Sequence, residues 1–265
     1  KYFTNNRKDH VSIDSFSRTA FEKELEIDKI SIINGSFNII TNEKDSLYVK
    51  MDSINFVLEK LKTDAKRLEE VLPFIYEDVQ LSSKAIFMNI NAYETLTIEN
   101  FNFSNHQFNL QNLYLKPKFT KEVLSSKIAF ERDRLQFHML ELKLNHLDFG
   151  IRNDTLFIIA DSGEIVNPNL TVYRDKSVTD DVTTKKMYSK ILRDLPFDLE
   201  IAELNIIEGY ISYTERVDKF GKAGEIFFKN VNSTLSNLTN TNKNSKETKI
   251  IIKSYFMGKA PMELV

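Results

Sequence analysis

The sequence contains 265 residues, of which 42% are hydrophobic, and its 36 Lys and Arg nearly balance 38 Asp and Glu, giving a formal net charge of -2. This balance argues against a polybasic surface for nucleic acid or membranes, and the absence of cysteine excludes disulfide scaffolds, thiolate metal sites and cysteine catalysis. No run of about 18 apolar residues could cross a membrane as a helix, and a start at Lys1 without Met indicates a piece of a longer protein.

Strands dominate the elements that the sequence predicts. Residues 1–20 are polar and mixed, so we expect a linker or a loosely attached first element there. A turn or a single helical turn is expected at 120–124, after Pro117. Strand patterns cover residues 25–61, 84–115, 135–173, 197–238 and 250–256.

Two segments between the strand blocks have the spacing of short helices. The first covers residues 62–72, with Asp64 as its expected N-cap and Pro73 closing it. The second covers residues 179–195 and again ends before a proline, Pro196.

One spacing of apolar residues recurs along the chain: apolar, any, apolar, any, any, apolar, any, apolar. It occurs at Leu25–Ile32, Val49–Phe56, Leu96–Phe103, Phe108–Leu115, Phe137–Leu144, Leu142–Phe149 and Leu199–Ile206. On a helix these four positions form no single face. On a strand each pair shares a face, and a bulge or corner at the slip returns the second pair to the face of the first. The spacing therefore predicts a mainly β fold, an elongated, curved antiparallel sheet with one apolar face and two short helices.

An internal repeat supports a stacked array. Residues 25–37 align without gaps on residues 199–211, and Gly35 and Gly209 occupy the same place in the two copies. We expect both glycines in hairpin turns with positive φ. The array divides approximately into blocks 21–75, 76–130, 131–195 and 196–265, after the linker 1–20.

No motif in the sequence points to catalysis, a metal or a cofactor. The histidines have no metal-ligand spacing, and nucleophile-elbow, dinucleotide and phosphate-loop motifs are missing. Adjacent acids at 69–70 and 180–181 fall in helical or loop segments, where they are usually solvated. We therefore expect a protein that is not an enzyme and uses neither metal nor cofactor. The histidines are His10, His106, His138 and His146.

The apolar face leaves two possibilities open. A second sheet could cover it, which would give a closed structural or adhesive module of the cell envelope. Alternatively, the face could stay open as a groove for acyl chains, which gains about 25 cal/mol for each Å² of apolar surface covered by lipid.

The segment Leu195–Glu215, from Leu-Pro-Phe-Asp-Leu-Glu-Ile to Gly-Tyr-Ile-Ser-Tyr-Thr-Glu, resembles the AsmA-like proteins of Gram-negative bacteria. Residues Gly224–Val231 and Asn237–Asn240 continue the resemblance, which is closest to versions from the Bacteroidota. The resemblance implies a repeating β-groove in the periplasm that guides phospholipid between the inner and outer membranes and maintains the outer envelope. It also implies an inner-membrane anchor outside this chain, outer-membrane proteins as further partners, and no catalytic residues. The balanced charge argues against nucleic acid as a partner.

If the groove is present, the apolar residues of the bent strands should line it. The candidate lipid-binding residues are Ile30, Ile32, Phe37, Ile98, Phe101, Phe103, Leu142, Leu144, Leu147, Leu204 and Ile206.

Overall fold

The structure is a computed structural model that describes residues 24–41, 46–64, 66–67, 72–183, 188–218, 221–241 and 247–265. The first strands are β1 (Leu25–Thr41), β2 (Ser46–Thr63), β3 (Asp78–Asn89), β4 (Glu94–Ser104), β5 (Gln107–Pro117), β6 (Arg134–Asn145) and β7 (Asp148–Arg152). The others are β8 (Thr155–Val166), β9 (Asn169–Asp175), β10 (Asp198–Arg216), β11 (Gly224–Thr239), β12 (Lys249–Phe256) and β13 (Ala260–Leu264). The helices are α1 (Lys121–Lys127) and α2 (Tyr188–Arg193).

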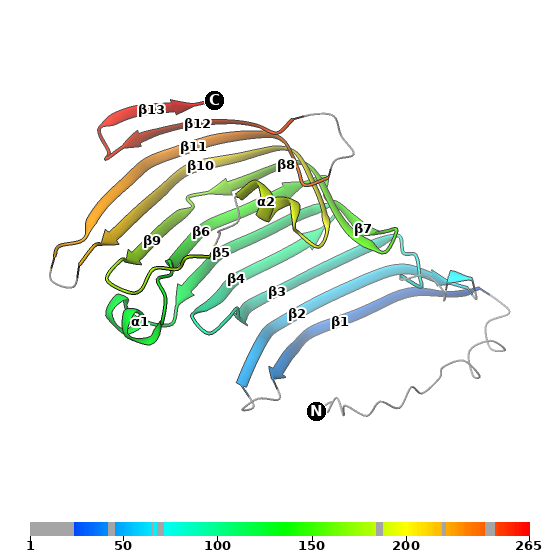
Figure 1. The fold of residues 1–265 in the computed structure, drawn as a ribbon. Coiled ribbons are helices and arrows are strands. Elements are labelled where there is room, and N and C mark those ends of the chain that lie inside the picture. The colour runs from blue at the N-terminus through cyan, green and yellow to red at the C-terminus, as the bar shows by residue number, and fades with distance from the viewer. Residues whose placement is uncertain are drawn as a thin grey trace. The chain divides into compact units, whose positions relative to one another are not determined.

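All thirteen strands belong to one curved sheet, so the prediction of a mainly β fold is confirmed (Figure 1). Neighbouring strands follow the order β1-β2-β3-β4-β5-β6-β8-β10-β11-β12-β13, with β7 paired to β8 and β9 paired to β6 and β10. Most neighbouring strands in the sheet are antiparallel, as expected, but the sheet is mixed, because β10 runs parallel to both β8 and β9.

The parallel pairing follows from one interrupted strand. The first part of β10 pairs with β8 and the second part with β9, while β6 pairs antiparallel with both. β8 and β9 thus act as one long strand, broken at Asn167 and Pro168. A parallel neighbour requires the chain to return to its starting end, and the segment between Asp175 and Asp198, which contains α2, makes that return.

The chain divides into two compact units. Among the described residues, the smaller comprises those up to Ile30 together with those between Leu58 and Asp78, and cross-strand ion pairs such as Lys29–Glu59 (3.1 Å) lie on its surface. The larger comprises Ser31–Val57 and Val79–Val265 and contains most of the sheet. The four repeat blocks remain a prediction, and the expected linker 1–20 lies outside the described residues.

The helices differ in part from the expectation. β2 continues to Thr63, so no helix begins at residue 62. Asp64 accepts a hydrogen bond from the Arg67 N–H (2.8 Å), as an N-cap would. Residues 65 and 68–71 lie outside the described part. The second predicted helix is confirmed over a shorter span, as α2.

The helical turn expected at 120–124 is a longer helix, α1. The Thr120 side chain caps it by accepting a hydrogen bond from the Val123 N–H (3.3 Å). Glu122 in the first turn and Lys127 in the last turn complement the helix dipole, and Leu124 is buried beneath it.

The slip in the apolar spacing coincides with left-handed residues inside the strands. Ser53 and Asn112, which stand at the slips of Val49–Phe56 and Phe108–Leu115, have φ of 53° and 52°. In the pair β4–β5 the register continues across the break without an extra residue, so the two strands bend together there. A true register shift occurs in the pair β10–β11 around Gly209.

The prediction that Gly35 and Gly209 occupy turns with positive φ is wrong. Both glycines lie inside long strands, β1 and β10, and the residue before each takes the left-handed conformation: Asn34 (φ 53°) and Glu208 (φ 55°). Glycine is needed for close packing instead. A Cβ on Gly209 would lie 3.2 Å from the Cβ of Val231.

The two copies of the repeat nevertheless share one local structure. In the first copy, Asn55 Oδ1 accepts from the Asn34 N–H (3.1 Å) and Asn55 Nδ2 donates to the Ser53 carbonyl (3.3 Å). The second copy repeats this pattern, since Asn232 Oδ1 accepts from the Glu208 N–H (3.0 Å) and Asn232 Nδ2 donates to the Asn230 carbonyl (3.0 Å). An asparagine on the neighbouring strand thus clamps each left-handed residue.

Candidate functional site

Two clusters of apolar side chains cover one face of the larger unit. The buried centre of the first comprises Phe103, Leu147, Ala160, Ile201 and Leu204. The buried centre of the second comprises Ile86, Ile98, Leu110 and Met139. Phe101, Phe108 and Ile165 pack against both clusters. We call the continuous surface that these residues form the apolar face.

No second sheet packs on the apolar face among the described residues, because every described strand belongs to the same sheet. Side chains such as Phe101, Phe108 and Leu144 therefore stay only half-buried although they belong to the clusters. The centres of the clusters are buried and the side chains around them are partly open to solvent, and an apolar surface that stays partly open on a soluble protein usually marks a binding site.

The structure brings together seven of the predicted groove residues within the two clusters. These are Ile98, Phe101, Phe103, Leu142, Leu144, Leu147 and Leu204. Ile206 shares their face, because it stands opposite Ile165 in the register between β10 and β8. The other three lie on β1: Ile32 and Phe37 are each 49% exposed, and Ile30 belongs to the smaller unit. None of those three is part of either cluster.

The sequence analysis missed the contribution of β8. Ile158, Ala160 and Ile165 belong to the apolar face, and together with Gly163 they have the recurring spacing. Small residues at two of the four positions hid the pattern. Gly163 is small because a Cβ there would lie 2.8 Å from the side chains of both Leu144 and Leu204.

The chirality of the residues decides which side of the sheet is apolar. Consider a strand drawn with its chain running upward. Because the residues are L-amino acids, a residue whose N–H and C=O groups point to the left has its side chain directed away from the viewer. The Arg216 carbonyl accepts a hydrogen bond from the Lys176 N–H, just after β9, and β9 lies to the left of β10 along its direction in Figure 1. Arg216 therefore points away from the viewer.

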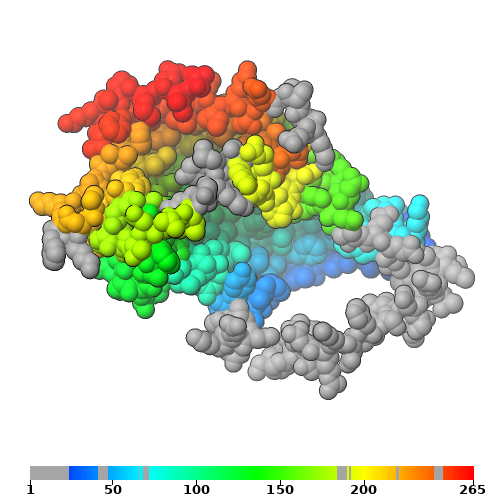
Figure 2. Space-filling view, viewed as in Figure 1, coloured from blue at the N-terminus to red at the C-terminus, as the bar shows by residue number. Residues whose placement is uncertain are grey.

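Ile211, five residues earlier in the same regular stretch, points toward the viewer. It stands opposite Leu170, which stands opposite Phe137 of the second apolar cluster. The apolar face is thus the face shown in Figure 2, where the surface is hollowed over β4 to β6. α2 lies on this same side of the sheet.

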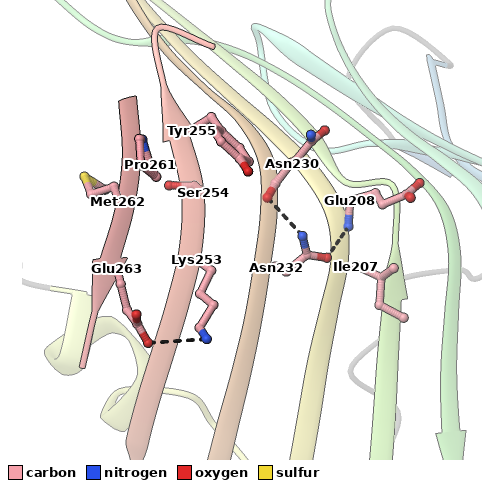
Figure 3. A pocket seen from close by; sticks show the side chains of 10 residues that line it. All are labelled: Ile207, Glu208, Asn230, Asn232, Lys253, Ser254, Tyr255, Pro261, Met262 and Glu263. Atoms are coloured by element: carbon pink, nitrogen blue, oxygen red, sulfur yellow. Dashed lines mark hydrogen bonds and ion pairs between the residues drawn. The ribbon is translucent and has the colours of Figure 1, made fainter. Parts of the chain in front are cut away.

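The opposite face carries an open trough of about 700 Å³ between β10 and β13 (Figure 3). Asn232 of β11 and Lys253 of β12 are paired there. Asn232 is three residues from Leu235 along a regular stretch of β11, so its side chain lies on the opposite face from Leu235, which belongs to the apolar face. Lys253 forms an ion pair with Glu263 (3.5 Å). The polar residues of this trough are Glu208, Asn230, Asn232, Lys253, Ser254, Tyr255 and Glu263.

A buried charged cluster lies where β9 and β10 end. Asp175 is 3% exposed, pairs with Arg216, and accepts hydrogen bonds from Ser125 (2.6 Å) and Ser177 (2.6 Å). Burial raises the pKa of Asp175, but these donors outweigh it and hold the pKa well below its usual range. The cluster ties α1 to the sheet.

The pKa of Tyr213, on β10, is shifted upward. Burial and its hydrogen bond to Glu215 raise the pKa of Tyr213 to about 12. It therefore keeps its proton throughout the neutral range.

The histidines do not converge. His106 Nδ1 lies 3.1 Å from the Leu147 carbonyl, His138 stacks on Tyr114 with ring centroids 4.2 Å apart, and His146 lies 3.3 Å from Asp161. His10 lies outside the described part. No group of three potential metal ligands occurs among the described residues, and none of the helices in that part is long and apolar enough to cross a membrane.

No protein-family model matches the chain, and comparisons with curated proteins and with solved structures gave no significant match.

Proposed function

We propose that this chain is a non-enzymatic lipid-binding segment whose apolar face holds phospholipid acyl chains. The observation that carries the proposal is the apolar face itself, continuous from β3 to β11 and without a second sheet over it among the described residues. The resemblance of Leu195–Glu215 to AsmA-like proteins points the same way. On this proposal the segment works in the periplasm, between an inner-membrane anchor outside this chain and outer-membrane partners.

The energetics of such a face suit transfer. An acyl chain leaving water for the apolar face gains roughly 0.8 kcal/mol for each methylene covered. An acyl chain leaving a bilayer gains almost nothing, because its methylenes are already away from water. The lipid would therefore exchange reversibly between bilayer and protein, while the aqueous space between two membranes would remain strongly unfavourable for it.

The position of α2 supports the same proposal. It lies on the apolar side of the sheet, in the return between β9 and β10. A short helix crossing an otherwise open face leaves room for a chain-like ligand beside it, whereas a second sheet would fill the face. The alternative function, a structural module of the cell envelope, requires another protein surface to cover the apolar face.

A pair of matched substitutions on β6 tests the proposal. Leu144 belongs to the apolar face, whereas Leu140, next to Met139 on the same strand, is 44% exposed on the other face. Leu144→Asn should weaken binding of a fluorescent phospholipid about tenfold, and Leu140→Asn should leave it unchanged. Thermal melts of both variants verify that they fold.

The parent protein should also carry phospholipid when it is purified from cells and analysed by native mass spectrometry. A parent that neither carries nor binds phospholipid would refute the proposal. If that parent were also a dimer that Leu144→Asn dissociates, a structural role with a covered apolar face would replace it.

A further inference from the structure

The outer edge of β1 is uncovered in the larger unit. β1 stands at the end of the strand order and pairs only with β2 among the described strands. Its part in the larger unit, residues 31–40, contains neither a charged residue nor a proline. Large apolar side chains are exposed there, including Ile33 (82%), Phe37 (49%) and Ile40 (56%). Natural sheets usually protect an edge with charges or proline, because an unprotected edge pairs with other strands.

The other parts of the two outermost strands carry such protection. Residues 25–30 of β1 include three charged side chains, those of Glu26, Asp28 and Lys29. At the opposite end of the strand order, β13 carries Pro261 and Glu263. Residues 31–40 are therefore the unprotected stretch, which is typical of an edge that takes a partner strand.

The second copy of the repeat shows which backbone groups face this edge. In β10 the N–H of the left-handed Glu208 is directed to β11, and the N–H of Tyr210 is directed to the other side, where it donates to the Pro168 carbonyl (2.8 Å). In β1 the N–H of the left-handed Asn34 is directed to β2, so the N–H of Ser36, two residues later, points away from β2. Alternation along the strand then directs the N–H and C=O groups of residues 36, 38 and 40 to the free edge.

The same edge is covered in the second copy. β9 pairs with β10 from Tyr210 to Arg216. Ser212, which takes the place of Asn38, is only 2% exposed there. Because the two copies share their local structure, β1 is shaped to accept a neighbouring strand where β10 has one.

We propose that a second copy of this chain pairs with β1 along this edge, antiparallel, about a two-fold axis at Asn38. In this register Phe37 stands opposite Ile39 of the second copy, so apolar side chains meet. The two Asn38 amides stand opposite each other, and an amide both donates and accepts hydrogen bonds. The stretch brings no charge to the contact. The axis is perpendicular to the sheet, so both apolar faces remain uncovered and on the same side of the joined sheet.

Sedimentation velocity on the full chain without lipid tests the proposal, at concentrations from about 10 µM to 1 mM. The paired stretch is short, so the parent should show a reversible equilibrium between monomer and dimer in this range. Asn38→Lys should weaken dimerisation about tenfold, because two like charges then face each other at the axis. Asn38→Asp should do the same. An equimolar mixture of the two variants should recover the dimer, because unlike charges then pair.

Two control variants exclude other modes of association. Leu144→Asn on the apolar face and Glu263→Lys on β13 should both leave the dimer unchanged, and thermal melts verify that every variant folds. The assay contains no lipid, so its result is independent of the lipid proposal. A parent that stays monomeric to about 1 mM would overturn the proposal, since another part of the chain would then cover or block this edge. A dimer that survives Asn38→Lys, or a mixture that does not recover it, would also overturn the proposal.

Discussion

Asn232→Ala offers the sharpest test of how the long strands keep their apolar side chains on one face. The Asn232 side chain accepts from the Glu208 N–H (3.0 Å) and donates to the Asn230 carbonyl (3.0 Å), so it clamps two left-handed residues on adjacent strands. Alanine removes both bonds. A hydrogen bond contributes about 1 kcal/mol net, so the loss of two should lower the free energy of unfolding by about 2 kcal/mol.

Water can reach this clamp and replace part of the lost hydrogen bonding, so we expect the decrease in the free energy of unfolding to be at least about 1 kcal/mol. Urea unfolding followed by circular dichroism measures the difference, and Asn232→Asp separates the two bonds because it keeps the acceptor and removes the donor. Asn55→Ala, at the equivalent clamp in the first repeat, should show a similar loss. If the free energies of unfolding of Asn232→Ala and Asn55→Ala both lie within about 0.3 kcal/mol of the parent value, the clamps do not stabilise the strands and our reasoning is wrong.

Two further predictions concern the charged cluster and the packing of β8. Asp175→Asn should destabilise the fold by about 3 kcal/mol at neutral pH, because it leaves Arg216 without its buried partner. Since the folded pKa of Asp175 is depressed, the advantage of the parent should persist down to about pH 4 and disappear as the pH falls further; a constant difference below pH 4 in pH-dependent urea melts would contradict this. Gly163→Ala should cost about 1 kcal/mol, because its Cβ would meet Leu144 and Leu204 at 2.8 Å. Gly224→Ala, with no atom within 4 Å of its Cβ, should leave the melting temperature unchanged or raise it, and equal effects of the two substitutions would refute the packing argument.

The sequence alone determined that the chain forms long strands with one apolar face. The recurring spacing fits a bent strand and no helix, and the quartets Leu96–Phe103 and Phe108–Leu115 stand opposite each other in the sheet as continuous apolar rows. The local likeness of the two repeats was also visible in the sequence, since each copy places Gly35 or Gly209 directly after the residue that becomes left-handed.

Only the tertiary structure decided how these pieces combine. The left-handed conformation fell on Asn34 and Glu208 instead of the glycines, because an asparagine from the next strand binds the N–H of each. Such a cross-strand partner cannot be identified from local propensity. The parallel neighbour of β10, the placement of α2 and the trough beside Tyr255 likewise depend on which strands become neighbours. Apolar periodicity specifies the face that a side chain occupies, whereas pairing between distant strands depends on the whole network of long-range contacts.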